Sequence, residues 1–340
     1  MRIPLTKLEE ARVLLQQYFT PTPVTKATRQ SPTDDAFFMK VETGLPTGSF
    51  KVRGAVYALS VNARTRPIAE VTAASTGNHG AAVAYAGRLL GIPARIFLPE
   101  HPNPVKAQRI RDSGGTIVEA GRDLSATIDA AYEYARRTGA FFLHDAADPD
   151  VPAGAGTIAL EVLEQLPSVE AIYVPMGDTA LIRGVASAAK QVKPAIFIVG
   201  VVAERAPAYF LSWQERVAVE TPSADTIADG LAVRRALQPN VDDVCALVDD
   251  VQLVSEREML QAIEYLSSAE HVLAEPAGAA ATAAYLKDSK RRRESVALVT
   301  GGNRAPDASQ AVPPENGASH FHDSRSAASG SRFAARRAGM

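Results

Sequence analysis

Short runs of β-branched residues alternate along the chain with longer runs rich in alanine and leucine. The short runs are apolar throughout, which is typical of strands covered on both faces, and the longer runs have the length of helices. Strands are predicted at 36–40, 94–98, 116–118, 171–174, 196–201 and 296–299. Helices are predicted at 54–61, 80–90, 104–112, 124–137, 157–165, 181–190, 256–268 and 279–288, with another in the N-terminal stretch MRIPLTKLEEARVLLQQ. This alternation predicts an α/β protein with a mostly parallel sheet and helices on both faces.

Composition narrows the class of protein further. A chain of 340 residues with 46% apolar and 22% charged residues has the length of about two domains and excludes a wholly disordered protein. The net charge of −2 gives no reason to expect nucleic-acid or membrane-surface binding, and no stretch approaches the roughly 18 apolar residues of a membrane span. A single cysteine, Cys245, excludes an intrachain disulfide and a multi-cysteine metal site. We therefore expect a cytoplasmic protein, with a disordered tail at 311–340 that is rich in Ala, Ser, Gly and Arg.

Two segments place reactive side chains where predicted helices begin. The run PTGSFKVRGA (46–55) delivers Lys51 to the start of a helix, where a cation opposes the helix dipole. A partly desolvated lysine there suits imine chemistry, although an ordinary surface lysine is the alternative interpretation. The run STGNHG (75–80) offers hydroxyls and backbone N–H groups that suit a substrate carboxylate. Its alternative interpretation is a helix cap with a glycine turn.

Two further segments follow apolar strands. VPMGDTALIRG (174–184) has the strand–turn–helix form of a phosphate cup, but one glycine and an acid make this signal weak. TGGN (300–303) ends a buried strand on a hydroxyl and two glycines, which also fits a plain strand end and turn.

Taken together, these segments resemble the fold-type II pyridoxal-phosphate enzymes, specifically the serine/threonine dehydratase and serine racemase family. The resemblance extends over about residues 15–304 and includes Thr20-Pro21, Lys40-Val41-Glu42, GAGTIALEVLEQLP (154–167), TIADGLA (226–232) and AEPAGAA (274–280). It implies two domains with open, mostly parallel twisted sheets flanked by helices, as in the tryptophan synthase β chain. Residues 1–55 and 146–310 would form a large cofactor-binding domain, and residues 56–145 a small substrate-clamping domain. A homodimer is also implied.

The resemblance implies a role for each matching residue. Lys51 would carry pyridoxal 5′-phosphate and act in catalysis together with Thr76. Phe50 would pack near the cofactor ring, Asn78 would bond its 3-oxygen, and Gly230 would lie against its other face. The remaining cofactor contacts would be Gly177, Asp178, Thr179, Ala180 and Leu181 around the phosphate, Glu275 at the polar edge of the ring, and Thr300 at the pyridine nitrogen. The amino-acid substrate would be surrounded by Ser75, Thr76, Gly77, His79 and Ala146.

The Thr300 hydroxyl bears on the reaction that the resemblance implies. A hydroxyl cannot keep the pyridine nitrogen protonated as a carboxylate can, so the ring becomes a weaker electron sink and prompt loss of a β-leaving group is favoured. Lys51 would remove the α-proton, and the products would be a 2-oxo acid and ammonia. The resemblance thus implies a dehydratase, an ammonia-lyase, for a small β-hydroxy amino acid of the threonine/serine type.

Three departures from the family pattern change these expectations. Asp178 and its neighbours replace a run of four glycines, and we expect the Asp178 carboxylate to turn away from the phosphate and cap the following helix. Apolar residues in VVAERAPA (201–208) replace the acids with which many relatives bind a divalent cation, so we predict no metal there. Ala146 stands where the family typically places a larger side chain over the substrate and would enlarge the pocket, and Asp145 or Asp148 could meet a substrate cation.

The substrate and the reaction each leave an alternative open. GDTALIRG (177–184) and ERAPAYFLSW (204–213) resemble the dehydratase subgroup linked to hydroxyectoine breakdown, which implies a 3-hydroxy-2,4-diamino acid. An amino-acid racemase is the first alternative function, because Thr76 keeps the hydroxyl that racemases of the family carry as serine. The second alternative is a catalytically silent relative that binds a ligand, which the unusual phosphate loop would favour.

Overall fold

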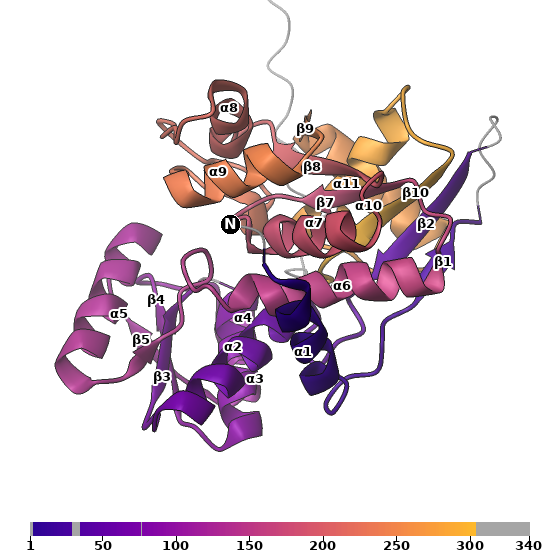
Figure 1. Ribbon diagram of the computed structural model, residues 1–340. Helices are drawn as coiled ribbons and strands as arrows, with labels where there is room; N and C mark the ends of the chain where they lie inside the picture. The colour runs from indigo at the N-terminus through magenta and orange to yellow at the C-terminus, as the bar shows by residue number, and fades with distance from the viewer. Residues whose placement is uncertain (1–2, 29–34, 76, 304–340) are drawn as a thin grey trace, which may run out of the picture. The chain divides into compact units, whose positions relative to one another are not determined.

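The computed structural model describes residues 3–28, 35–75 and 77–303, and Figure 1 shows the order of their elements. The helices are α1 (Leu5–Leu15), α2 (Lys51–Thr65), α3 (Asn78–Leu90), α4 (Pro104–Asp112), α5 (Leu124–Thr138), α6 (Val151–Gln165), α7 (Ala180–Val192), α8 (Ala208–Glu215), α9 (Gln238–Leu247), α10 (Glu256–Ser268) and α11 (Pro276–Lys287), with a 3-10 turn η1 (Asp229–Leu231). The strands are β1 (Val24–Lys26), β2 (Ala36–Val41), β3 (Val71–Ala74), β4 (Ala94–Leu98), β5 (Gly115–Glu119), β6 (Phe141–Phe142), β7 (Ala171–Pro175), β8 (Phe197–Ala203), β9 (Asp250–Val254) and β10 (Glu294–Val299).

These strands form two sheets. One has the order β1-β2-β10-β7-β8-β9 and is parallel except for β1, and the other is wholly parallel with the order β5-β4-β3-β6. The predicted α/β class with mostly parallel sheets is therefore confirmed. The four-stranded sheet lies within 56–145, the range predicted for the substrate-clamping domain, but the assignment of that domain and of 1–55 with 146–310 stays a prediction. The predicted tail, 311–340, and Thr76 lie outside the described residues.

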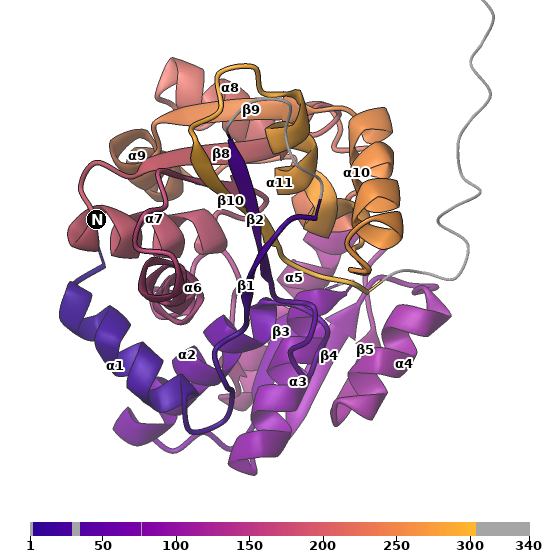
Figure 2. The ribbon, with the colours of Figure 1, turned by 90° about the vertical axis from the view of Figure 1, so that its right-hand side faces the viewer.

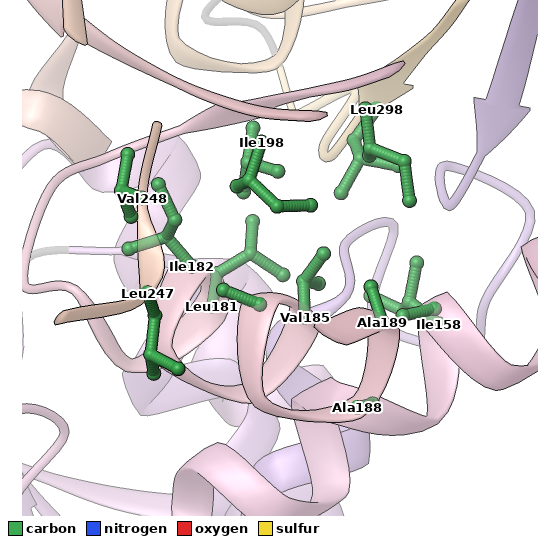
Figure 3. Close-up of a cluster of buried hydrophobic side chains, with 14 of the residues drawn as sticks. Ile158, Leu181, Ile182, Val185, Ala188, Ala189, Ile198, Leu247, Val248 and Leu298 are labelled. Atoms are coloured by element: carbon green, nitrogen blue, oxygen red, sulfur yellow. The ribbon is translucent and has the colours of Figure 1, made fainter. Parts of the chain in front are cut away.

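The six-stranded sheet is covered on both faces, as its apolar strands require. Ile198 and Leu298 point to one face and pack with Ile158 of α6 and with Ile182 and Val185 of α7 (Figure 3). The residues next to them along the strands point to the other face, since side chains alternate along a strand, and they pack with α10 and α11. Figure 2 shows the sheet between these two pairs of helices.

The four-stranded sheet is built in the same way. Ile96 and Leu98 of β4 belong to the same buried cluster as residues of α2, α3 and α4. Phe97, between them in sequence, points to the opposite face, where its ring lies 5.4 Å from the ring of Tyr134 on α5. Among the described helices, none is long and apolar enough to cross a membrane.

Glycines let three helices approach one another closely. A Cβ atom on Gly154 of α6 would lie 2.4 Å from the carbonyl oxygen of Arg53 on α2, and one on Gly184 of α7 would lie 2.1 Å from the carbonyl oxygen of Pro152. Real Cβ atoms do not come so close, so larger residues would push α6 away from its neighbours. Helix α6 begins at Val151, six residues before the predicted start at 157. The sequence of this first part contains Gly154 and Gly156, which are more typical of a turn than of a helix, and the close helix contacts explain why glycines stand there.

A buried network of charges joins α2 and α6 to the end of β2. The Arg53 guanidinium donates to Glu42 at 2.7 Å and to Glu161 at 2.6 Å, and the Lys40 ammonium donates to Glu161 at 2.6 Å. All four side chains are buried, and the Thr22 hydroxyl donates to Glu42 at 2.5 Å. The two positive and two negative charges balance, which is the condition under which buried charges are tolerated.

The loop between β7 and α7 contains a residue with a left-handed backbone. Thr179 has φ of 75°, although it is β-branched, and such residues rarely adopt this conformation. Its hydroxyl is buried and has no hydrogen-bond partner among the described residues. The backbone therefore keeps a turn that glycine would form with less strain.

Replacing Arg53 by methionine should strongly destabilise the fold. The Arg53→Met substitution leaves Glu42 and Glu161 buried with one cation between them, which typically costs about 3–5 kcal/mol. Urea unfolding would measure the loss. The matched control is Arg205→Met, because Arg205 is half-exposed, pairs with Asp225, and should cost no more than about 1 kcal/mol. Equal losses in the two variants would contradict this account of the network.

At position 179, glycine should be more stable than alanine. Both substitutions remove the orphaned hydroxyl, but only glycine relaxes the left-handed backbone, so Thr179→Gly should exceed Thr179→Ala by about 1 kcal/mol in the free energy of unfolding. Urea unfolding of the two cofactor-free variants makes the comparison. An alanine variant as stable as the glycine variant would mean that the turn at 179 is not strained.

Candidate active site

The four segments singled out in the sequence come together at the carboxyl ends of the strands. Helix α2 begins with Lys51, and the loops that follow β3, β7 and β10 carry the other three segments. Ligands bind at this edge in open parallel sheets, because the loops leave the strands there and meet helix N-termini. The Phe50 amide donates to the Thr300 carbonyl at 2.9 Å, which fixes the start of α2 beside the end of β10.

Two carboxylates flank the Lys51 amine. Lys51 Nζ donates to Asp145 Oδ2 at 2.5 Å and also to Asp178 Oδ2, and it lies 5.2 Å from the centre of the Phe50 ring. The Lys51 side chain is 11% exposed. Burial lowers the pKa of Lys51, but the attraction of Asp145 and Asp178 outweighs burial and raises this pKa above its ordinary value.

The Asp178 carboxylate makes two contacts. Asp178 Oδ1 accepts from the Ala180 amide at 2.9 Å and so caps the start of α7, as predicted. Its predicted turn away from the phosphate stays a prediction, and Asp178 Oδ2 contacts Lys51, a partner that the sequence did not predict. The reason is electrostatic: a buried carboxylate is stabilised by the nearest buried cation, and that cation is the Lys51 ammonium.

His79 stands on the far side of Asp145. Its Nε2 atom bonds to the Leu143 carbonyl at 3.0 Å and its Nδ1 atom lies 3.5 Å from Asp145 Oδ1. Burial raises the pKa of Asp145, but the attraction of His79 and Lys51 outweighs it, so this pKa lies below its ordinary value. Burial and the neighbouring charge of Asp145 raise the pKa of Asp178. The two carboxyl groups therefore differ, and Asp178 is the more readily protonated of the pair.

Asn78 and Glu275, both predicted to contact the cofactor, contact each other. Asn78 Nδ2 donates to Glu275 Oε1 at 2.6 Å, and Asn78 Oδ1 accepts from Asn303 Nδ2 at 2.7 Å. A Cβ atom on Gly301 would lie 2.5 Å from Glu275 Oε1, so the glycine makes room for this carboxylate. Burial raises the pKa of Glu275. Asn303 was missed as a site residue, although it is the last residue of the TGGN segment.

The predicted phosphate loop lies against the TIADGLA segment. A Cβ atom on Gly177 would lie 2.1 Å from the Gly230 carbonyl oxygen, so the two backbones are in close contact. Ala180 and Leu181 form the first turn of α7, where backbone N–H groups have no carbonyl partner within the helix and favour an anion. One of these donors, the Ala180 amide, is taken by Asp178.

A buried amide that the sequence did not reveal connects two of the loops. Asn240 Nδ2 donates to the Ala146 carbonyl at 3.2 Å and to the Asp178 carbonyl at 3.4 Å. Arg183 Nη1 also donates to the Ala146 carbonyl at 3.2 Å, and its pKa is lowered by burial. Asn240 therefore joins the backbone of Asp178 to that of Ala146, the residue that follows Asp145. No local motif around Asn240 signals this role.

The substrate-binding residues are placed only in part. The Ser75 hydroxyl accepts from the Gly77 amide at 3.1 Å, which shapes the turn before α3, and His79 and Ala146 lie in the contacts given above. Thr76 lies outside the described residues, so its predicted role is not addressed. Within the described part of the chain, no group of three His, Cys, Asp or Glu side chains could hold a metal ion.

These residues fit the predicted cofactor. The buried amine of Lys51 can attach an aldehyde, and the first turn of α7 and the orphaned Thr179 hydroxyl offer donors for a phosphate. Asp178 is the exception, because its charge near that turn opposes an anion.

Comparison with known proteins agrees with this fit. Residues 15–301 match the family described as "Pyridoxal-phosphate dependent enzyme". The chain is 38% identical over 268 residues to an L-threonine ammonia-lyase of Geobacter sulfurreducens, covering 78% of this chain and 67% of that protein. It is 35% identical over 303 residues to an L-threonine ammonia-lyase of Thermotoga maritima, covering 88% and 76%.

A solved structure is similar over the same region. Maize serine racemase superposes with a TM-score of 0.85 at 30% identity, covering 90% of this chain and 95% of that one. The family match extends over most of the chain, from residue 15 to residue 301, and includes three of the four segments whole and the start of the fourth, TGGN. The chain therefore belongs to the family of pyridoxal-phosphate-dependent enzymes and uses pyridoxal 5′-phosphate as its cofactor.

Proposed function

We propose that this pyridoxal-phosphate-dependent ammonia-lyase deaminates a β-hydroxy amino acid of the threonine/serine type by β-elimination. The observation that carries the proposal is the buried Lys51 amine, placed where the loops after β3, β7 and β10 converge. The ammonia-lyases of two bacteria that resemble this chain over most of its length support the reaction class.

When bound, pyridoxal 5′-phosphate supplies the electron sink that acidifies the substrate α-carbon. The chain supplies orientation and proton transfer. Lys51 takes the α-proton at Nζ, and Asp145 and Asp178 stabilise the ammonium that results. The first turn of α7 with Thr179 binds the phosphate, and Asn78 with Glu275 orients the ring.

Three further expectations belong to this proposal. The 3-hydroxy-2,4-diamino acid suggested by the hydroxyectoine subgroup stays a prediction; its support is the small Ala146 beside the carboxylate of Asp145. A homodimer and a cytoplasmic location also stay predictions. The partner molecule of the proposed reaction is a small amino acid. The described helices include none that could span a membrane.

Amino-acid racemisation is the second candidate, favoured by the likeness to maize serine racemase. It requires an acid or base on the face opposite Lys51, for which Thr76 is the predicted residue. The silent-relative alternative is opposed by the intact Lys51. Three measurements on the same purified protein distinguish the three functions: ammonia release, chiral chromatography of the amino acid, and cofactor retention.

Replacing Lys51 by alanine should abolish deamination. Purified wild-type protein with pyridoxal 5′-phosphate should release ammonia and a 2-oxo acid from L-threonine, and Lys51→Ala should lose at least about 1,000-fold in rate because both cofactor attachment and the proton acceptor are removed. Lys190→Ala is the control, because Lys190 pairs with Asp249 at the other end of α7. If wild-type protein retained cofactor but racemised threonine or serine without releasing ammonia, the proposed β-elimination would be wrong.

A further inference from the structure

The arrangement around Lys51 has a consequence for how the cofactor is attached. To attach, the Lys51 amine adds to the aldehyde carbon of pyridoxal phosphate, a C=N bond forms, and the aldehyde oxygen leaves as water with the two amine hydrogens. Only the neutral amine can add, because the ammonium has no free electron pair. The ammonium must therefore lose a proton before attachment.

The structure places two acceptors on that ammonium. Asp145 comes from the loop after β6 and Asp178 from the loop after β7. Both carboxylates contact Lys51 Nζ, and the lysine side chain is almost fully shielded from water. Asn240 connects the two loops, since its amide donates to the carbonyl of Asp178 and to the carbonyl of Ala146, the neighbour of Asp145. An ion pair in such surroundings is far stronger than at a surface.

We propose that Asp145 and Asp178 hold Lys51 as an ammonium until cofactor arrives, so that loss of one proton gates covalent loading of this enzyme. The proposal rests on the proposed function, because it takes Lys51 as the attachment point. The same pair makes Lys51 a strong proton acceptor once the enzyme is loaded. The two carboxylates that slow attachment of the cofactor therefore also favour removal of the substrate α-proton by Lys51.

The other charged groups near Lys51 do not replace this pair. His79 on α3 faces Asp145, and His144 lies next to Asp145 in the same loop. Glu275 at the start of α11 also interacts electrostatically with Lys51, but its carboxylate bonds to Asn78. Among the acids, only Asp145 and Asp178 are in direct contact with Nζ within the described part of the chain.

The test measures how fast Lys51 reacts with an aldehyde as a function of pH. Cofactor-free full-length protein is mixed with pyridoxal, the C=N bond is reduced with borohydride, and mass spectrometry of peptides measures labelling at Lys51. Pyridoxal without its phosphate is the probe, because Asp178→Asn would also relieve repulsion of a phosphate. Asp249→Asn is the matched control, since Asp249 pairs with Lys190 and not with Lys51.

At neutral pH, Asp145→Asn and Asp178→Asn should each label Lys51 at least about tenfold faster than wild type. Removing a carboxylate lowers the pKa of Lys51, and each unit multiplies the neutral fraction tenfold. The advantage should shrink as pH rises toward the pKa of the wild-type lysine, and Asp249→Asn should label at the wild-type rate.

Two other outcomes are distinguishable. Wild-type rates at every pH in either variant, with the native circular dichroism spectrum, would overturn the gating proposal and leave the proposed function intact. Absence of labelling at Lys51 in every protein, at alkaline pH and with pyridoxal phosphate in excess, would instead remove Lys51 as the attachment point and with it the proposed function.

Discussion

The structure around Lys51 depends on a buried ion network that includes Arg53, two residues further along the chain. The Arg53 guanidinium on α2 donates to Glu42, the residue after β2, and to Glu161 on α6. Because buried charges are costly without partners, this network allows little freedom in where α2 begins. The position of the Lys51 amine is thus set by charges that have no direct part in the chemistry. Residues of three segments that carry the family resemblance meet in this network: Lys40 and Glu42, Arg53, and Glu161.

The bounds of a helix could be predicted from the sequence where local capping residues mark its start. Helix α4 begins and ends as expected, since Asn103 caps the amides of Val105 and Lys106. Helix α10 also has its predicted bounds, because Ser255 and Glu258 form a capping box. Local pattern failed where tertiary packing decides. Strand β3 (Val71–Ala74) was not predicted, because two alanines are a weak strand signal, and α6 began early because its glycines serve helix contact.

The site could be predicted as a set of residues but not as a set of contacts. The motifs located Lys51, Asn78 and Glu275, and the structure brings the last two within hydrogen-bond distance. The pairing of Asp178 with Lys51 joins positions 127 residues apart, and no local rule reports it. Asn240 was missed for the same reason. Both belong to electrostatic and hydrogen-bond partnerships that exist only after the chain folds.

The visible absorption spectrum of the purified chain tests the central claim most directly. The protein would be loaded with pyridoxal 5′-phosphate at alkaline pH, freed of excess cofactor, and recorded before and after addition of L-threonine. The account predicts a protein-bound visible band that changes when threonine is added, while ammonia accumulates. A folded protein that retains no band after loading would contradict it, because the residues that converge on Lys51 would then not form a cofactor site.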